Sequence, residues 1–481
     1  MSNARRLGAG GAWLLTGQLG SVVIQFAYAA LTARILTPSD FAIYAIAVIV
    51  ANLVAVFSVA GLGQAVARLD VLDASLLRSL STVSFVVGLA AMLIVAAPAS
   101  LWALLWNSPS SGPAIALAGV TALFAPAVGL LSGYMRRVGK FRILSIVQLG
   151  SSLAAFGVSF VMVLVWRSSL SLVASAVMLQ IFCWIALAII CRRNILPGRV
   201  RWKETAPHLS FSWRVTAANL MSFALENVPK LLVSRFSGPV QLGYWNRADV
   251  IATVPFDRLN AAVAQVLYPE YRHDAGNPSR VGRRWPDMLA LVAWLTVPLA
   301  CFVAGAAPVL VPLLLGPAWV EAVPFVTALA LASALRGISL QLASALEAIA
   351  RFKWIWAAQG VLLAALVPVG ILTSVTGNIW IAIGYCVVFP AARHAFQLIM
   401  CVRAGFFPLG LVLRAYLQPG LIGMFAFATA RMAAETTGAL PLVMRVITEG
   451  LLALAAVCAI WLLRRRLGIW ALLSTYGFGK N

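Results

Sequence analysis

Six charged side chains lie inside long apolar stretches of this sequence, where an ionised group is costly. They are Glu226, Lys230, Asp257, Arg258, Arg336 and Arg393. A charge within such a stretch is a candidate for a functional site, because it persists only where a partner or a water-filled cavity compensates its lost hydration. The three arginines with one neighbouring aspartate leave an excess of positive charge, which favours an anionic ligand.

Arginine suits phosphate because its planar guanidinium binds two oxygens at once and keeps its charge when desolvated. We predict that Lys230, Arg258, Arg336 and Arg393 bind a substrate that carries phosphate or pyrophosphate. The alternative is structural: Arg258 pairs with Asp257, Arg336 caps helix carbonyls, and Lys230 pairs with Glu226, which is four residues away on the same helix face.

Carboxylates inside the apolar stretches are candidates for coupling transport to an ion. Glu226 and Asp257 are two such candidates, and each has an alternative role as the acidic member of an ion pair. Glu347 and Glu449 are further candidates. Glu449 follows Arg445 by four residues, so the two can pair along one helix face.

The stretches that carry these residues have the length of membrane spans. Hydrophobic residues make up 62% of the 481 residues and charged residues 10%, too few to cover the surface of a soluble protein. A helix crosses a bilayer in about 20 apolar residues. The sequence therefore predicts an all-helical polytopic membrane protein with about fourteen transmembrane helices, at residues 11–33, 43–66, 80–105, 114–135, 143–166, 171–191, 211–235, 247–268, 288–315, 322–346, 355–375, 379–401, 411–430 and 443–463.

The net charge of +22 follows from the distribution of Lys and Arg between the loops. With the N-terminus in the cytoplasm, most basic residues fall in inner loops, including the clusters 136–142, 192–203 and 272–284. This bias is the positive-inside rule, and it predicts an even number of spans with both termini cytoplasmic. No nucleic-acid-binding signature accompanies the charge, so we expect no nucleic-acid partner.

An internal repeat relates the two halves of the chain. Arg34 to Tyr44 and Arg235 to Trp245 both fit R-x-x-x-P-x-x-[F/L]-[A/G]-x-[Y/W], at an offset of 201 residues. Six spans separate the copies, so the repeats share one orientation in the membrane. We predict two parallel pseudo-symmetric six-helix lobes, 1–195 and 196–405, followed by two C-terminal helices and a tail in 406–481.

The sequence shows no arrangement typical of an enzyme or of a metal site. The six cysteines contain no C-x-x-C pair, and the three histidines lack metal-ligand spacing. Neither a G-x-S-x-G nor a phosphate-binding P-loop is present. We therefore predict a non-enzymatic protein that requires no cofactor.

The chain resembles the polysaccharide or lipid-linked-oligosaccharide flippases (Wzx-type) of the multidrug/oligosaccharidyl-lipid/polysaccharide exporter superfamily. The segment Ala33-Arg34-Ile35-Leu36-Thr37-Pro38-Ser39-Asp40-Phe41 is similar to the family's first two helices. Further similar segments are 11–13, 61–65, 230–235, 242–248, 254–255, 266–269 and 316–319. The chain departs from the family at Pro229, where Asp is frequent, and at Ala42 and Ala350, where Gly is frequent.

The resemblance implies an inner-membrane flippase that moves a polyprenyl-pyrophosphate-linked oligosaccharide from the cytoplasmic to the periplasmic face by alternating access. It implies that basic residues in a central cavity meet the pyrophosphate or acidic sugars, and that the product serves exopolysaccharide, O-antigen or capsule synthesis. Membrane lipids and the polysaccharide polymerase machinery are the further expected partners. Two alternatives stay open: a multidrug and toxin extrusion-type cation antiporter, and a flippase for lipid II.

Overall fold

The computed structural model describes residues 20–59, 74–191, 202–274 and 276–462, and within these ranges every regular element is a helix. The all-helical prediction is confirmed. The chain divides into two compact units, Met1–Asn246 and Arg247–Asn481, with the boundary inside helix α10 (Pro239–Ala252). The predicted lobes 1–195 and 196–405 rest on the sequence repeat and stay a prediction.

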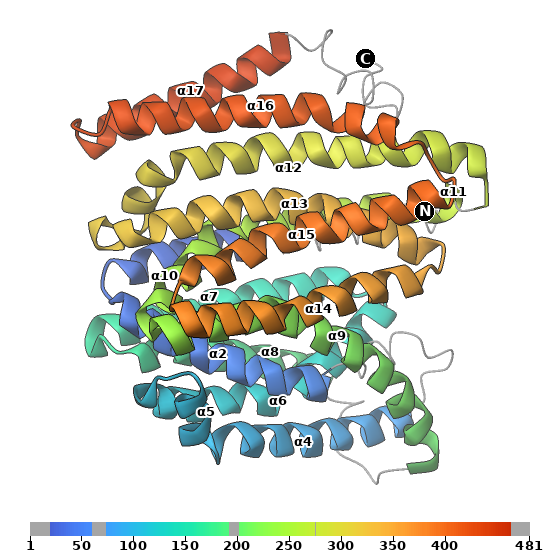
Figure 1. Cartoon of the computed structure of the whole chain (residues 1–481). Helices are drawn as coiled ribbons and strands as arrows, with labels where there is room; N and C mark the ends of the chain where they lie inside the picture. Colours follow the sequence, from blue (N-terminus) through green and yellow to red (C-terminus); the bar gives the residue numbers. More distant parts are fainter. Residues whose placement is uncertain (1–19, 60–73, 192–201, 275, 463–481) are drawn as a thin grey trace. The chain divides into compact units, whose positions relative to one another are not determined.

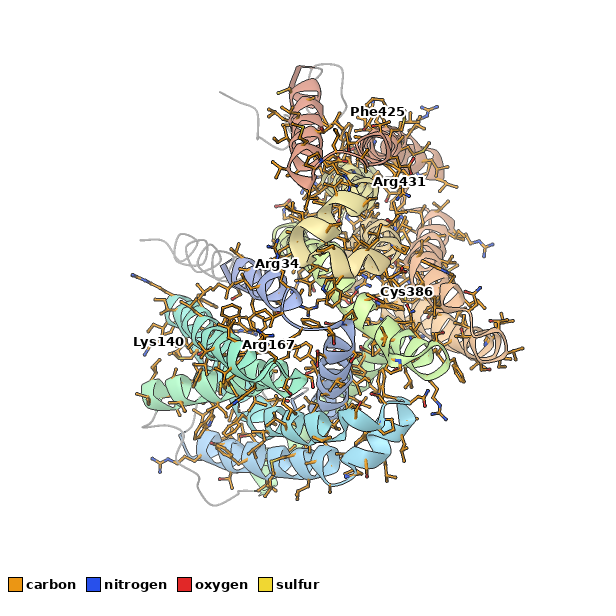
Figure 2. The ribbon with its side chains drawn as sticks, turned by 90° about the vertical axis from the view of Figure 1, so that its left-hand side faces the viewer. Arg34, Lys140, Arg167, Cys386, Phe425 and Arg431 are labelled. Carbon is orange, nitrogen blue, oxygen red and sulfur yellow. The ribbon has the colours of Figure 1, made fainter. Side chains whose placement is uncertain are left out.

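The first unit is organised around α6 (Gly112–Arg137), which packs against α2 (Pro38–Val59), α4 (Ala74–Ala96) and α8 (Ser169–Cys191). Helix α7 (Phe141–Trp166) packs on α8, and Lys140 and Arg167 flank α7 (Figure 2). Short α5 (Ala99–Leu105) follows a break at Pro98, and α9 (Trp202–Ser237) completes the unit.

The second unit is organised around α12 (Pro278–Leu315) and α13 (Val323–Ala348), which pack on each other. Helix α16 (Leu409–Thr436) lies alongside α12 over most of its length (Figure 1). Helices α11 (Val254–Asp274) and α15 (Ile379–Arg403) both pack on α13, so α13 stands between them. Helices α14 (Phe352–Thr376) and α17 (Leu442–Leu462) pack at the edges, on α15 and on α12 with α16 respectively.

Ten of the described helices are long and apolar enough to cross a membrane, and they correspond to ten of the predicted spans. The protein is a multi-pass membrane protein. The predicted spans 211–235 and 247–268 are helical, but they are not among these ten. Helices α9 and α11 are too polar, and α10 has only 14 residues. The helix 20–33 is apolar but shorter. The exact count of fourteen stays a prediction.

The predicted repeat has a structural counterpart, because α2 begins at Pro38 and α10 begins at the equivalent Pro239. Proline is favoured in the first turn of a helix, where its missing N–H has no partner to lose. Before Pro38, the Thr37 N–H and hydroxyl both donate to the Asp40 carboxylate, at 3.0 and 2.7 Å. The residue before Pro239 is Gly238, which has a φ of 98°. Only glycine adopts this backbone conformation readily, so the second copy begins its helix after a glycine turn and not after a threonine bonded to aspartate.

The two copies of the motif touch each other within the first unit. A Cβ atom on Gly243 would lie 1.9 Å from the carbonyl oxygen of Pro38, so only glycine permits this approach. Gly243 is the equivalent of Ala42 in the repeat, and Ala42 is itself buried. The glycine that the second copy retains is therefore explained by packing of one copy on the other.

Prolines inside α12 leave backbone carbonyls without their usual helical donor, and side chains replace it. Pro308 cannot donate to the carbonyl of Ala304, and Pro312 cannot donate to that of Pro308. The Thr327 hydroxyl donates to the Ala304 oxygen at 3.2 Å, and the Arg445 guanidinium donates to the Pro308 oxygen at 3.3 Å. These bonds satisfy the carbonyls left without a donor by Pro308 and Pro312, two of the four prolines inside α12.

Candidate functional site

The six predicted site residues lie in both units. Glu226 and Lys230 are on α9 of the first unit, where Glu226 is exposed and Lys230 is half-buried. Asp257 and Arg258 are on α11, Arg336 is on α13 and Arg393 is on α15, all in the second unit. Within the second unit, the structure places Asp257 beside Arg336 and Arg393 beside Ser339, so both contacts involve α13. The ion pair of Glu226 with Lys230 stays a prediction.

Helix α11 presents Asp257 in its first turn because the chain breaks at Thr253, just before Val254 and Pro255. We expected Asp257 near the middle of one continuous helix. The carboxylate of Asp257 lies 3.6 Å from the guanidinium of Arg336, with 46% and 26% of the two side chains exposed. A charge-assisted hydrogen bond is about 2.7–2.9 Å long, so this pair is loose and open to solvent.

Arg393 is oriented by two neighbours that the sequence analysis missed. Its Nε donates to the Ser339 hydroxyl at 2.7 Å, and its guanidinium lies over the ring of Phe389 at 5.5 Å. Ser339 follows Arg336 by three residues on α13, so one face of that helix holds one arginine and orients the other. The spacings 336–339 and 389–393 were the sequence signal for this contact.

Arg258 is exposed and makes no ion pair within the described ranges. The structural alternative paired it with its neighbour Asp257, but Asp257 meets Arg336 from another helix instead. Adjacent residues on a helix point about 100° apart, which explains why the sequence neighbours do not pair.

Buried amide side chains lie on the same three helices, α11, α13 and α15. The Gln341 side chain donates to the backbone oxygen of Asn260 at 3.1 Å, and the Asn260 side chain fits against Gly337, where a Cβ would approach it to 2.6 Å. The amide oxygens of Asn260 and Gln341 and both amide atoms of Gln397 have no hydrogen-bond partner among the described residues. Such groups are normally satisfied by water or a ligand. Helices α11, α13 and α15 therefore offer a ligand buried amide groups in addition to the charged side chains that the sequence indicated.

The arrangement provides guanidinium donors for an anion. The contact between Asp257 and Arg336 is 3.6 Å long, so the oxygens of a phosphate can replace it with shorter ones. Arg393 is pre-oriented by Ser339 and Phe389, which reduces the conformational entropy lost on binding. Within the described ranges, no group of three or more His, Cys, Asp and Glu side chains could hold a metal ion.

A different arginine of the second unit is held tightly. At the junction of α11 and α12, Arg284 donates to Asp274 at 2.7 Å and to Glu270 at 2.8 Å. The Asp274 side chain is fully buried, and Tyr271 and Trp285 pack edge to face beside it at 5.5 Å. With two carboxylates in direct contact, Arg284 fastens this turn and leaves no excess positive charge for a ligand.

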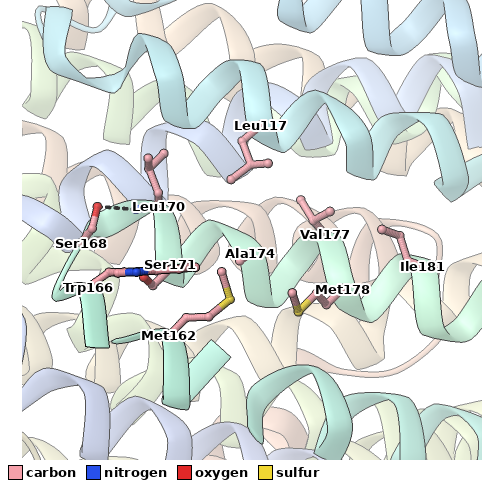
Figure 3. Close-up of a pocket in the computed structure, with 10 residues that line it drawn as sticks. All are labelled: Leu117, Met162, Trp166, Ser168, Leu170, Ser171, Ala174, Val177, Met178 and Ile181. Atoms are coloured by element: carbon pink, nitrogen blue, oxygen red, sulfur yellow. Dashed lines mark hydrogen bonds between the residues drawn. The ribbon is translucent and has the colours of Figure 1, made fainter. Parts of the chain in front are cut away.

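The first unit contains a cavity of about 450 Å³ between α6, α7 and α8. Figure 3 shows that its walls are largely aliphatic and sulfur-containing side chains, with Trp166 and Ser168 at one end. None of the six predicted site residues lines it. It is an apolar space without a charged donor, so it does not suit a phosphate.

The comparisons with known proteins agree with this membrane architecture. Residues 31–324, more than half of the chain, match the family model described as polysaccharide biosynthesis protein. The chain belongs to this family. This polysaccharide biosynthesis protein is therefore a member of the Wzx-type group predicted from its sequence motifs.

Curated relatives come from bacterial polysaccharide systems. The teichuronic acid biosynthesis protein TuaB of Bacillus subtilis (strain 168) is 25% identical over 224 residues, 46% of each chain. The lipopolysaccharide biosynthesis protein WzxC of Escherichia coli (strain K12) is 24% identical over 251 residues, 51% of this chain and 50% of WzxC. The chain spans about half the length of these two relatives.

Solved structures show that this polysaccharide biosynthesis protein has a transporter fold. The lipid II flippase MurJ in an inward closed conformation superposes with a TM-score of 0.69 at 12% identity, covering 94% of this chain and 99% of MurJ. The eukaryotic MATE transporter AtDTX14 gives 0.54 at 14% identity, covering 86% of this chain and 98% of AtDTX14. At such identities the likeness concerns the fold alone.

Proposed function

We propose that this protein is an inner-membrane flippase that moves polyprenyl-pyrophosphate-linked oligosaccharide repeat units from the cytoplasmic to the periplasmic face by alternating access. The observation that carries the proposal is the loosely paired Arg336, which stands one turn from the serine that orients Arg393. Family membership and the names of TuaB and WzxC support a role in surface polysaccharide synthesis.

In this mechanism Arg336 and Arg393 contact the pyrophosphate, and Arg258 and Lys230 add positive charge along the path. Asp257 holds Arg336 when the substrate is absent and releases it when phosphate oxygens compete. Asp257 and Glu226 are also the residues to test for ion coupling. The lobes 1–195 and 196–405 would move about the substrate, with residues 406–481 outside them and both termini in the cytoplasm.

The decisive experiment is deletion of the gene in its native host, followed by measurement of surface polysaccharide and of polyprenyl-linked intermediates. We expect loss of polymer, with lipid-linked repeat units retained on the cytoplasmic face. Wild-type protein should restore the polymer, and Arg336→Ala should not, although it reaches the membrane folded. Unchanged polymer and intermediates in the deletion strain would contradict the proposal and favour a cation antiporter.

A second candidate function is flipping of lipid II, the substrate of the flippase MurJ, whose fold this chain shares. Lipid II also carries a polyprenyl pyrophosphate, so the arginines serve either substrate equally well. The deletion separates the two: loss of surface polymer with normal peptidoglycan supports the first candidate, and accumulation of peptidoglycan precursors supports the second.

A further inference from the structure

The carboxyl group of Glu449, on α17, is buried away from the candidate site. The residue is 5% exposed, and neither carboxylate oxygen has a hydrogen-bond partner among the described residues. An ionised carboxylate in such a position is strongly disfavoured, because it has lost its hydration without gaining a donor. Its environment in this structure therefore suits the neutral, protonated form.

The one arginine within a helical turn of Glu449 makes other contacts. Arg445 donates through Nη2 to the carbonyls of Pro308 and Ala434, at 3.3 and 3.4 Å. The first of these carbonyls lacks a helical donor because of Pro312. The expected ion pair of Arg445 with Glu449 is absent from the described contacts, since the guanidinium satisfies α12 and α16 instead. The Nε of Arg445 is buried and has no partner there.

The helices that pack against α17 supply no other counter-charge for Glu449. Helix α12 carries no charged residue between 288 and 315, and its thiol, Cys301, lies against Gly423 of α16. On α16, Arg431 pairs with Glu435 at 2.6 Å on an exposed surface (Figure 2 labels Arg431). Among α12, α16 and α17, Arg445 is therefore the residue that can donate a hydrogen bond to an ionised Glu449 carboxylate.

We propose that Glu449 is a proton-binding site and that Arg445 is its switch partner. With the proton bound, Arg445 holds the Pro308 and Ala434 carbonyls and so ties α17 to α12 and α16. When the proton leaves, the carboxylate accepts from the unused Nε of Arg445 and draws the guanidinium away from those carbonyls. The Glu449 site lies on α12, α16 and α17, whereas the arginines of the candidate site lie on α11, α13 and α15. The proton site therefore stands whether or not the proposed function does.

Infrared spectroscopy of the purified full-length chain, in a detergent without ester or carboxyl groups, tests the proton directly. A protonated carboxylic acid has a carbonyl stretch distinct from that of a carboxylate. The chain has only 14 Asp and Glu residues, so one protonated acid is a resolvable part of the signal. We expect a band at neutral pH that Glu449→Gln removes and that Glu435→Gln leaves intact. Equal spectra for wild type and Glu449→Gln would overturn the proposal.

The switch is tested by Arg445→Gln in the same measurement. Without the guanidinium, no positive charge stabilises the ionised form of Glu449. The band of the protonated acid should therefore persist to a pH about one unit or more higher than in wild type. A band that disappears at the same pH in both proteins would refute the part assigned to Arg445. Since the readout is spectroscopic, a failure here is distinct from a failure of the proposed transport activity.

Discussion

Two arginines of the second unit meet carboxylates in opposite ways. Arg284 contacts two carboxylates at 2.7 and 2.8 Å, and one of them belongs to the fully buried Asp274. Arg336 lies 3.6 Å from the carboxylate of Asp257, with both side chains partly exposed. The same residue type thus fastens a helix junction in one place and offers donors to a ligand in the other, and the difference lies in the distance to the carboxylate and in burial.

The comparison shows how to separate structural from ligand-binding charges in a membrane protein. A buried charge whose partners neutralise it contributes to the fold, and removing it leaves those partners uncompensated. A loosely held, partly exposed charge contributes little to stability, and its removal weakens binding of the ligand. Stability and export should therefore respond oppositely to substitutions at the two arginines.

The largest expected effect on the fold comes from Arg284→Ala. It leaves Asp274 and Glu270 without their counter-charge, which should cost about 2–3 kcal/mol after allowance for the partly exposed Glu270. Thermal unfolding of the purified chain in detergent measures this loss. Arg280→Ala is the matched control, because the Arg280 side chain is exposed and its one hydrogen bond among the described residues is to His273. An unchanged midpoint for Arg284→Ala would remove the structural half of the comparison.

The largest expected effect on function comes from Arg336→Ala. Loss of a hydrogen bond to a charged group costs about 1.5–3 kcal/mol, so export should fall about tenfold or more. Thermal unfolding should stay within about 1 kcal/mol of wild type, because the pair with Asp257 is exposed and long. Arg336→Lys should restore export only in part, since lysine lacks the two-pronged contact. Normal export by Arg336→Ala would sink the assignment.

A smaller effect on export is expected from Ser339→Ala. The substitution removes the hydroxyl that orients Arg393 and leaves the charge in place, so the loss should be about 1 kcal/mol, or roughly fivefold. The polysaccharide complementation assay measures it beside Arg393→Ala, which should be the more severe of the two. Equal loss in both would mean that Ser339 acts by something other than orienting the arginine.

The smallest effect is expected from Arg431→Ala. Its partner Glu435 is four residues away on the same helix, and the two side chains are 40% and 62% exposed. Exposed pairs of this kind contribute about 0.3–0.5 kcal/mol. Neither the unfolding midpoint nor export should change measurably. A large change in either would show that distance and exposure do not rank the arginines of this protein.

Much of the fold was predictable, because apolar stretches of membrane length fix where helices form whatever their neighbours are. The region 202–274 was predicted least well. There the predicted spans 211–235 and 247–268 coincide with the polar helices α9, α10 and α11, and a break at Thr253 puts Asp257 in the first turn of α11. The relatives' frequent glycine at position 350 also has its reason in the structure, where Ala350 has a φ of 58°.

The sequence by itself determined the membrane class, the repeat that begins α2 and α10 at equivalent prolines, and the family. These depend on composition and on spacing along the chain, which are local properties. Only the tertiary structure decided that Asp257 pairs with Arg336 and not with Arg258, that Arg393 rests on Ser339, and that Arg445 satisfies Pro308 and leaves Glu449 alone. The choice of partner depends on which helices pack together, and residues 79 positions apart, such as Asp257 and Arg336, meet only once that packing exists.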